Sequence, residues 1–314
     1  MREPECQADG RSDSGKEARG APSTRDLRLA IHPVAAQGFE RAVDAYERGR
    51  PAYPAEAVAA VLAEVGLPSD DAPRVTLLDL GAGTGKLTRM LVPYGARVLA
   101  IEPVRGMRRK LVELVPTAEA LDGTAEAIPL PDGSVSAVTV GQAFHWFDSA
   151  KALAEIHRVL APGGRLALLW NMRDQGVGWV QRLSDILDRV RASGSRAEAP
   201  PHYASMAWRP AFDDNALFTP LVERRFRHEQ AFDTVDHFVD RVASISFIAA
   251  LDVPDRERVL REVRELCARQ TPTSERPLRL PYETFVYTCA RRDANEGAPP
   301  RREAAQGIPS EPLG

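Results

Sequence analysis

Apolar runs of strand length alternate with segments of helical periodicity through the middle of the chain. The runs at 74–80, 96–102, 134–140 and 165–170 are short and rich in Val, Leu and Ala. Between them, apolar residues recur every three or four positions, which is the spacing of one helix face. This order predicts a doubly wound, mostly parallel α/β sheet with helices on both faces.

Three helices are expected between these strands. The first ends at Gly95, the second follows Pro103, and the third begins at a capping Asp148 or Ser149 and ends in a Pro-Gly-Gly sequence. Their apolar faces comprise Leu87, Met90 and Leu91; Val104, Met107, Leu111 and Leu114; and Leu153, Ile156 and Leu160.

The pattern changes after Trp170. Helical periods fill 176–192 and 233–270, and strand-like runs occupy 221–230 and 283–291. The last run alternates strongly between apolar and polar residues, which is typical of a strand. We expect it to join the sheet late, with an antiparallel direction as one option.

The two ends of the chain lack the apolar residues that a core needs. Residues 1–30 consist mainly of Gly, Ser, Arg and acids, and residues 293–314 have a similar composition. Such segments cannot bury enough surface to offset the entropy lost on ordering. We therefore expect two disordered tails flanking one domain over residues 31–292.

Charge and cysteine content narrow the class of protein. The formal net charge is −3, from 41 basic and 44 acidic residues, so the composition gives no basic footprint for nucleic acid. The 3 cysteines are widely spaced and form no CxxC, which argues against a disulfide framework or a metal site. The apolar runs are shorter than the ~18 residues of a membrane span, and the N-terminus resembles no secretory signal. A cytoplasmic protein without membrane or nucleic-acid partners is expected.

The sequence LLDLGAGTGK at 77–86 places three glycines directly after the first strand. A phosphate-binding P-loop needs Ser or Thr after its lysine, but Leu87 follows Lys86. A dinucleotide loop needs G-x-G-x-x-G, whereas the spacing here is G-x-G-x-G, so that interpretation fits less well but stays open. The third candidate ligand is the amino-acid end of S-adenosylmethionine, which backbone amides can approach where no Cβ intervenes.

LLDLGAGTGK resembles the first motif of the class I S-adenosylmethionine-dependent methyltransferases. It is most similar to the methyltransferase type 11-like, small-molecule branch, which includes trans-aconitate-type enzymes. Further motifs follow in the family's order, among them DGTAEAIPLPDGSVSAV at 122–138 and EIHRVLAPGGRLALLW at 155–170. The resemblance implies a Rossmann-like sheet of seven strands, with core motifs in 75–170 and an acceptor-side insertion plus late strands in 171–292.

Two carboxylates stand at the ends of the first two strands. Glu102 follows Gly83 by 19 positions, where a carboxylate can accept hydrogen bonds from a ribose diol. Glu102 also precedes a helix, where a negative charge favours the helix dipole, and both roles are compatible. Asp79 can attract the ammonium of the cofactor, directly or through water.

The remaining cofactor contacts are implied by the resemblance. Residues 124–126 are expected against the adenine. Many relatives have Asp at the position of Thr124, which leaves open whether Thr124 or Glu126 contacts the exocyclic amine. The full expected cofactor set is Tyr46, Arg50, Asp79, Gly81, Ala82, Gly83, Glu102, Pro103, Thr124, Ala125, Glu126 and Gln142.

The segment FERAVDAYERGRPAYP at 39–54 resembles an N-terminal segment that covers the cofactor as a lid in the small-molecule branch. Arg50 is then expected near the carboxylate of the cofactor, because a guanidinium pairs well with a carboxylate. Tyr46 is expected to contact the cofactor and Tyr53 the acceptor. Simple packing of Tyr46 and a solvated Arg50 are the structural alternatives.

The sequence GQAFHWFD at 141–148 ends the fourth strand, which faces the sulfonium in this fold. Phe144 and Trp146 are expected to face the acceptor, since aromatic faces suit a sulfonium cation. His145 is the candidate catalytic base, because histidine ordinarily titrates near neutrality. A base is needed only if the acceptor loses a proton, so a plain pocket role for His145 stays open.

These residues together predict methyl transfer from S-adenosylmethionine to a small molecule of the carboxylic-acid or natural-product type. The fourth strand does not end in an Asn-Pro-Pro-Tyr type motif, which would have suggested an amide or exocyclic amine as acceptor. Two alternatives remain. One is a non-catalytic S-adenosylmethionine-binding or regulatory protein, and the other is a methyltransferase acting on RNA or protein.

Overall fold

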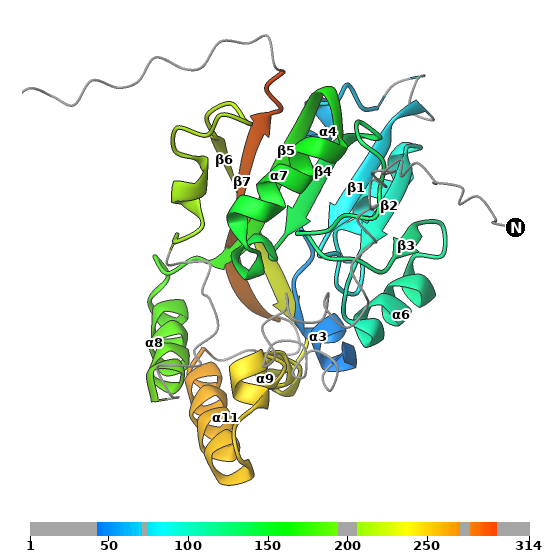
Figure 1. Cartoon of the computed structure of the whole chain (residues 1–314). Coiled ribbons are helices and arrows are strands. Elements are labelled where there is room, and N and C mark those ends of the chain that lie inside the picture. Colours follow the sequence, from blue (N-terminus) through cyan, green and yellow to red (C-terminus); the bar gives the residue numbers. More distant parts are fainter. Residues whose placement is uncertain (1–42, 69, 71–73, 194–205, 271–276, 294–314) are drawn as a thin grey trace, which may run out of the picture.

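The computed structural model describes residues 43–68, 70, 74–193, 206–270 and 277–293 (Figure 1). The expected tail at 1–30 lies outside the described residues, as does the second tail beyond Asp293. The disorder predicted for both tails stays a prediction.

The described residues form one seven-stranded sheet with the strand order β3-β2-β1-β4-β5-β7-β6. The strands are β1 (Thr76–Leu80), β2 (Arg97–Ile101), β3 (Glu119–Leu121), β4 (Val135–Gly141), β5 (Leu160–Arg173), β6 (Val222–Phe232) and β7 (Leu278–Ala290). Strands β1 to β5 pair in parallel, while β7 runs antiparallel to both β5 and β6. The predicted doubly wound, mostly parallel sheet is confirmed, and the late strand is antiparallel.

Three strands differ from the prediction, among them β7, which begins at Leu278 instead of at 283. β3 has only 3 residues, which is too short for an apolar run to reveal it in the sequence. β5 begins at Leu160, which pairs with Val135, and continues past the Pro-Gly-Gly sequence. Leu160 therefore belongs to the strand and not to the helix that was expected to contain it.

Helices cover both faces of the sheet because successive strand residues point to opposite sides. On one face, α4 (Ala55–Ala63) and α5 (Thr88–Leu91) pack with Leu77 of β1. On the other face, α7 (Ser149–Val159) packs with Leu78 and Leu80. The side chain of Asp148 caps α7 by accepting from the backbone N–H of Lys151 at 3.3 Å.

The other two predicted helices formed with shorter apolar faces. α5 contains 4 residues and continues as a 3-10 turn over Val92–Tyr94, which Gly95 ends with a φ of 80°. α6 (Arg105–Leu114) buries Met107 and Leu111, but Leu114 is 37% exposed. The expectation that Leu114 belongs to the buried face was wrong, and the buried residue at this end of α6 is Val115, directly after the helix.

A separate group of helices lies beyond the carboxyl ends of the parallel strands. It consists of α3 (Val43–Gly49), α8 (Gly178–Ser193), α9 (Val235–Ala243), α10 (Ser246–Ala249) and α11 (Val253–Ala268), which we call the helical layer. Figure 1 shows α8, α9 and α11 together at one end of the sheet, with α3 beside α9. α8 to α11 share their own apolar core, which includes Val180, Phe238 and Val263. Of the helices described, none combines the length and apolar character needed to cross a membrane.

Candidate cofactor and acceptor site

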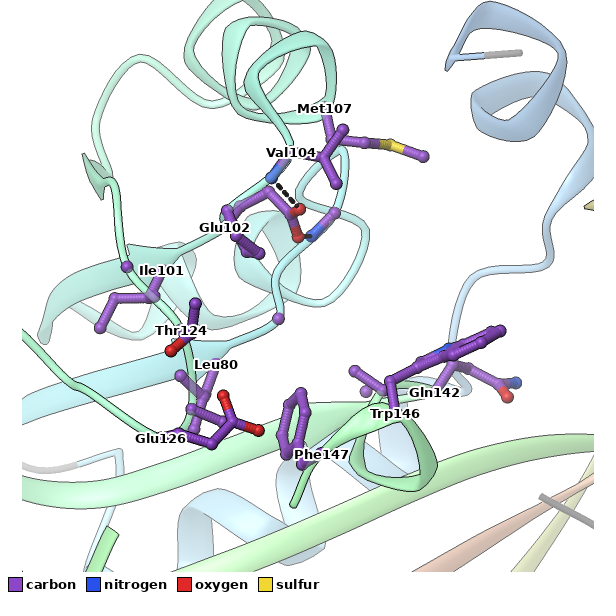
Figure 2. Close-up of a pocket in the computed structure, with 17 residues that line it drawn as sticks. Leu80, Ile101, Glu102, Val104, Met107, Thr124, Glu126, Gln142, Trp146 and Phe147 are labelled. Atoms are coloured by element: carbon purple, nitrogen blue, oxygen red, sulfur yellow. Dashed lines mark hydrogen bonds between the residues drawn. The ribbon is translucent and has the colours of Figure 1, made fainter. Parts of the chain in front are cut away.

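A cavity lies at the carboxyl ends of β1, β2 and β4, and its lining comes from the loops that follow these strands (Figure 2). Ligands of open α/β sheets bind at this point, where the strand order changes direction. Most of the predicted cofactor residues line this cavity: Gly81, Gly83, Glu102, Pro103, Thr124, Ala125, Glu126 and Gln142. The folding of the sheet therefore brings four separate sequence motifs together.

The glycine loop after β1 provides space for a ligand. Gly81 and Gly83 have φ angles of 70° and 60°, which side-chain-bearing residues rarely adopt. A Cβ on Gly81 would lie only 2.8 Å from the Cβ of Ala143. The loop can take this course only with glycine at position 81.

The amides of this loop have partners within the protein. The N–H groups of Gly81 and Ala82 donate to the carbonyl of Ile101 at 2.9 and 3.0 Å, and that of Gly83 donates to Glu102. The expectation that a cofactor approaches this loop stays a prediction, and the amides of Gly81, Ala82 and Gly83 are already bonded within the protein. What the glycines supply is clearance, while the amides hold the loop against β2.

Glu102 stands at the centre of the cavity wall. Its Oε2 accepts from the N–H of Gly83 and its Oε1 from the N–H of Val104, both at 2.8 Å (Figure 2). Burial raises the pKa of Glu102 to about 7, although both backbone hydrogen bonds act in the opposite direction. Each carboxylate oxygen keeps a further lone pair, so the group can also accept from a ligand diol.

Asp79 lines a neighbouring cavity on the other side of the glycine loop. Its Oδ2 accepts from the hydroxyl of Thr88 at 2.6 Å, and the carboxylate is almost completely buried. Burial raises the pKa of Asp79 to about 6, partly offset by hydrogen bonds from Thr88 and Thr139. A cation bound in this cavity would favour the ionised form of the Asp79 carboxylate.

Arg50, Tyr53, Ala82 and Lys86 also line this neighbouring cavity, which we call the loop cavity. Arg50 and Tyr53 thus lie beside the glycine loop, and their expected contacts with cofactor and acceptor stay predictions. Tyr53 is buried, and its hydroxyl oxygen comes within 2.5 Å of the position of a Cβ on Gly141. The helix α3 contains Tyr46, but the side chain of Tyr46 lies outside the described part of the structure.

A residue that sequence reasoning missed connects α3 to the glycine loop. Glu47 accepts from the hydroxyl of Thr84 through a short hydrogen bond, and its Oε1 lies 2.7 Å from Arg89 and 3.3 Å from Lys86. These contacts join positions about 40 residues apart in sequence, so no local pattern could have identified Glu47.

Thr124 and Glu126 differ in how their polar atoms are used. Glu126 accepts from the N–H of Asp148 at 2.9 Å, which attaches its side chain to the start of α7. The hydroxyl of Thr124 is buried in the cavity wall and bonds to no partner among the described residues. Because a buried hydroxyl without a partner is costly, Thr124 is the stronger candidate for contact with a ligand.

The aromatic residues after β4 separate into two groups. Trp146 and Phe147 line the cavity opposite Glu102 (Figure 2). Phe144 is fully buried and packs against Phe147 and Trp208, so it does not reach the cavity. Its expected acceptor contact is not supported by this position, because the 3-10 turn at 144–146 directs Phe144 into the core.

His145 lies in the same turn and packs against Trp146, with ring centroids 5.0 Å apart. The wall of the cavity includes Trp146 but not His145. Phe147, from the same aromatic run, also lines the cavity. Gln142 has a φ of 59°, an uncommon conformation for a residue with a side chain that often marks a functional site.

The comparisons with known proteins agree with this geometry. Residues 78–168 match the sequence profile of the family described as a methyltransferase domain. An uncharacterized methyltransferase of Mycobacterium tuberculosis is 41% identical over 272 residues, which cover 86% of this chain and 97% of that protein. A malonyl-[acyl-carrier protein] O-methyltransferase of Methylococcus capsulatus is 43% identical over 101 residues, which cover 30% of this chain and 37% of that protein.

The fold is also known from solved structures. A type II methyltransferase candidate from Anaeromyxobacter dehalogenans superimposes with a TM-score of 0.56 at 25% sequence identity, covering 76% of this chain and 97% of that chain. The likeness to the mycobacterial relative extends over nearly its whole length, so it includes the helical layer as well as the glycine loop. On this evidence the chain belongs to the class I S-adenosylmethionine-dependent methyltransferases.

Proposed function

We propose that this protein binds S-adenosylmethionine across the two cavities and transfers its methyl group to a small-molecule acceptor. The observation that carries the proposal is Glu102, a buried carboxylate fixed by two backbone N–H groups in a cavity wall. A carboxylate held in this way is suited to accept from a ribose diol, and its burial otherwise has a large cost.

The residues around Glu102 fit the rest of the cofactor. The unpartnered hydroxyl of Thr124 offers a hydrogen bond to an adenine edge. Met107 and Val104 add apolar surface to the same wall (Figure 2). On the other side of the loop, Asp79 is suited to the ammonium and Arg50 to the carboxylate of the amino-acid end.

When bound, the cofactor supplies an activated methyl group, so the protein needs mainly to bind and align the two reactants. Trp146 and Phe147 provide an aromatic wall that excludes water and suits a sulfonium. His145 supports this wall through its contact with Trp146. We propose a base role for His145 only where the acceptor must lose a proton.

A small acceptor is favoured by the form of the site. The wall beside Glu102 is mostly apolar and belongs to a cavity instead of an open basic surface. Several arginines on the edge strand β6 are already paired, such as Arg224 with Glu64 at 2.9 Å and Arg225 with Glu223 at 2.7 Å. The partial relative from Methylococcus capsulatus is named as an O-methyltransferase of malonyl-[acyl-carrier protein], which fits an acidic acceptor group.

Calorimetric titration of the full chain with S-adenosylmethionine and S-adenosylhomocysteine tests the cofactor. We expect micromolar binding in the wild type, no measurable binding for Gly83→Arg, and at least 30-fold weaker binding for Glu102→Ala, since the loss of hydrogen bonds to a charged group costs about 2 kcal/mol or more. Glu113→Ala, on the exposed side of α6, is the control and should bind like the wild type. A folded wild-type protein that binds neither ligand would overturn the proposal.

Turnover separates the proposed enzyme from the two alternatives. A panel of organic acids and phenols, assayed with cofactor that carries a labelled methyl group, should yield at least one methylated product. Cofactor binding without product on any small molecule would favour the regulatory alternative. Label in RNA or protein, and in no small molecule, would favour a macromolecular acceptor.

A further inference from the structure

Arg241 is the residue in the helical layer whose chemistry is not yet explained. It lies in the last turn of α9 and is only 5% exposed. Among the described residues, its Nε and Nη1 have no hydrogen-bond partner and its guanidinium forms no ion pair. A buried charge without a counterion is strongly unfavourable, so a buried arginine normally has an anion beside it.

The stem of Arg241 lies directly against the segment that leads into the loop cavity. A Cβ on Gly49 would come within 3.1 Å of Cδ and 3.2 Å of Cα of Arg241, so α3 and α9 are in close contact at this point. The next residue, Arg50, lines the loop cavity. Figure 1 shows this junction, where α3 meets α9.

Arg241 also acts on the glycine loop through its charge. Burial lowers the pKa of Lys86, attraction to Glu47 raises it, and the positive charge of Arg241 contributes to lowering it. Lys86 lines the loop cavity, so the charge of Arg241 is felt at the cavity wall. Arg241 and Lys86 are therefore close enough to repel each other electrostatically.

Two described carboxylates on this side of the glycine loop, Glu47 and Asp79, already have partners. Glu47 contacts Thr84, Lys86 and Arg89. Asp79 is held by the hydroxyl of Thr88. Among the described residues, the cations Arg50, Lys86, Arg89 and Arg241 therefore outnumber the carboxylates Glu47 and Asp79 at this junction, and a ligand anion would balance the difference.

We propose that Arg241 is a positioning residue for a carboxylate bound in the loop cavity, acting with Arg50 and Lys86. The inference rests on the proposed function, because the carboxylate comes either from the amino-acid end of S-adenosylmethionine or from an acidic acceptor. A guanidinium suits either source, since its planar donors match the two oxygens of a carboxylate.

The test compares Arg241→Met, which keeps the length of the side chain without its charge, with the wild type and Arg241→Lys. Arg264→Met is the matched control, because Arg264 is an exposed arginine of the same helical layer, 2.7 Å from Asp236. Each full-length protein is titrated with S-adenosylmethionine and with decarboxylated S-adenosylmethionine. In a second series, acetate, hexanoate, benzoate, succinate and tricarballylate are titrated in the presence of saturating S-adenosylhomocysteine.

Either of two results supports the proposal. If the cofactor is the source, Arg241→Met binds S-adenosylmethionine at least 10-fold more weakly than the wild type and binds the decarboxylated form equally well. If the acceptor is the source, cofactor affinity is unchanged, but at least one acid binds 10-fold more weakly to the variant. Arg241→Lys should recover part of the loss, and Arg264→Met should show none.

Two results overturn the proposal. The first is unchanged affinity of Arg241→Met for both cofactor forms and for every acid. The second is equally weakened binding of both cofactor forms by Arg241→Met, together with a lower unfolding temperature of the ligand-free variant. That result would show that Arg241 stabilises the fold and does not bind a carboxylate. An unpaired guanidinium predicts instead that the ligand-free Arg241→Met unfolds at the same or a higher temperature. Failure of the wild type to bind any cofactor form contradicts the proposed function, and the acid series, repeated without S-adenosylhomocysteine, then still tests Arg241.

Discussion

The site depends on two regions of the fold that differ in how their residues come together. The sheet side, from β1 to β4, contributes wall residues from the short loops directly after strands, such as Gly81 and Glu102. The helical layer supports these loops from outside the cavity lining: Glu47 of α3 contacts the glycine loop, and Arg241 of α9, nearly 200 residues later in the chain, packs against Gly49. On the sheet side, strand ends fix the positions of the functional groups, while in the helical layer helix packing fixes them.

This difference has a chemical counterpart. The carboxylates on the sheet side, Asp79 and Glu102, are held by hydrogen bonds to neighbouring backbone or hydroxyl groups. The charged groups of the helical layer meet across long sequence separations, as Glu47 does with Lys86 and Arg89. Changes on the sheet side should therefore affect cofactor affinity more than changes in the helical layer.

After the loss of binding expected for Gly83→Arg, the largest effect is expected from Gly81→Ala. The new Cβ would lie 2.8 Å from Ala143 in a residue with a φ of 70°, so the loop must move away from the cavity. We expect about 100-fold weaker binding of S-adenosylhomocysteine, from about 2 to 3 kcal/mol of strain and lost contacts. The control is Gly163→Ala, which has a φ of 74° with open space around it. Equal affinity of the two variants in calorimetry would contradict this role of the loop.

The second prediction concerns the aromatic wall. Trp146→Ala should lower kcat/KM for methyl transfer by about 30-fold, corresponding to ~2 kcal/mol of lost alignment in the transition state. Affinity for S-adenosylhomocysteine should fall less than threefold. The acceptor found in the panel serves for the assay, and Phe285→Ala, away from the cavity lining, is the control. A loss confined to cofactor affinity would assign Trp146 to the cofactor instead of the acceptor.

The third prediction is a pH dependence that originates on the sheet side. Because the pKa of Glu102 is raised to about 7, its ionised form is present above that pH and is lost as the pH falls. The ionised form accepts more hydrogen bonds, so affinity for S-adenosylhomocysteine should decrease about 5- to 10-fold from pH 7.5 to pH 6. Asp79, with a pKa of about 6, adds a further loss below pH 6.

Glu102→Gln isolates the contribution of Glu102 to this profile. The variant binds more weakly throughout, but its affinity should be nearly constant between pH 7.5 and 6.5, since the amide does not titrate there. Titration calorimetry at half-unit intervals of pH provides the comparison. A wild-type profile as flat as that of the variant would show that protonation of Glu102 does not control binding.

The fourth prediction tests the connection between the two regions. Glu47→Gln weakens the pairing of α3 with Lys86 and Arg89, and partly exposed ion pairs contribute only about 0.5 to 1 kcal/mol. We expect roughly threefold weaker cofactor binding and faster amide hydrogen exchange in residues 43–49. Glu113→Gln, which changes an exposed pair with Lys110, should alter neither quantity.

The smallest effect is expected from His145→Asn if the acceptor needs no base. In that case kcat falls about threefold through altered packing on Trp146, and the pH profile of kcat keeps its form. A catalytic base instead predicts a loss of at least 10-fold together with loss of the acidic limb of the profile. The measured profile decides between these two roles.

The sequence by itself determined the order of strands and helices and the identity of the glycine loop. Apolar runs, caps and glycines act over a few residues, so the parallel sheet, the Asp148 cap and the positions of Gly81 and Glu102 were readable from the sequence. Three-residue β3 and the true start of β5 were not, because neither leaves a periodic pattern. Phe144 was misplaced because an aromatic run does not show which of its rings points into the core.

Only the tertiary structure decided how distant charges meet. The contact of Glu47 with the glycine loop and the burial of Arg241 beside Gly49 depend on the packing of α3 and α9. Raised pKa values at Asp79 and Glu102 arise from burial, which is a property of the whole fold. Local chemistry thus determined which residues stand at the strand ends, while the surrounding packing determined their pKa values and which distant charged side chains lie near them.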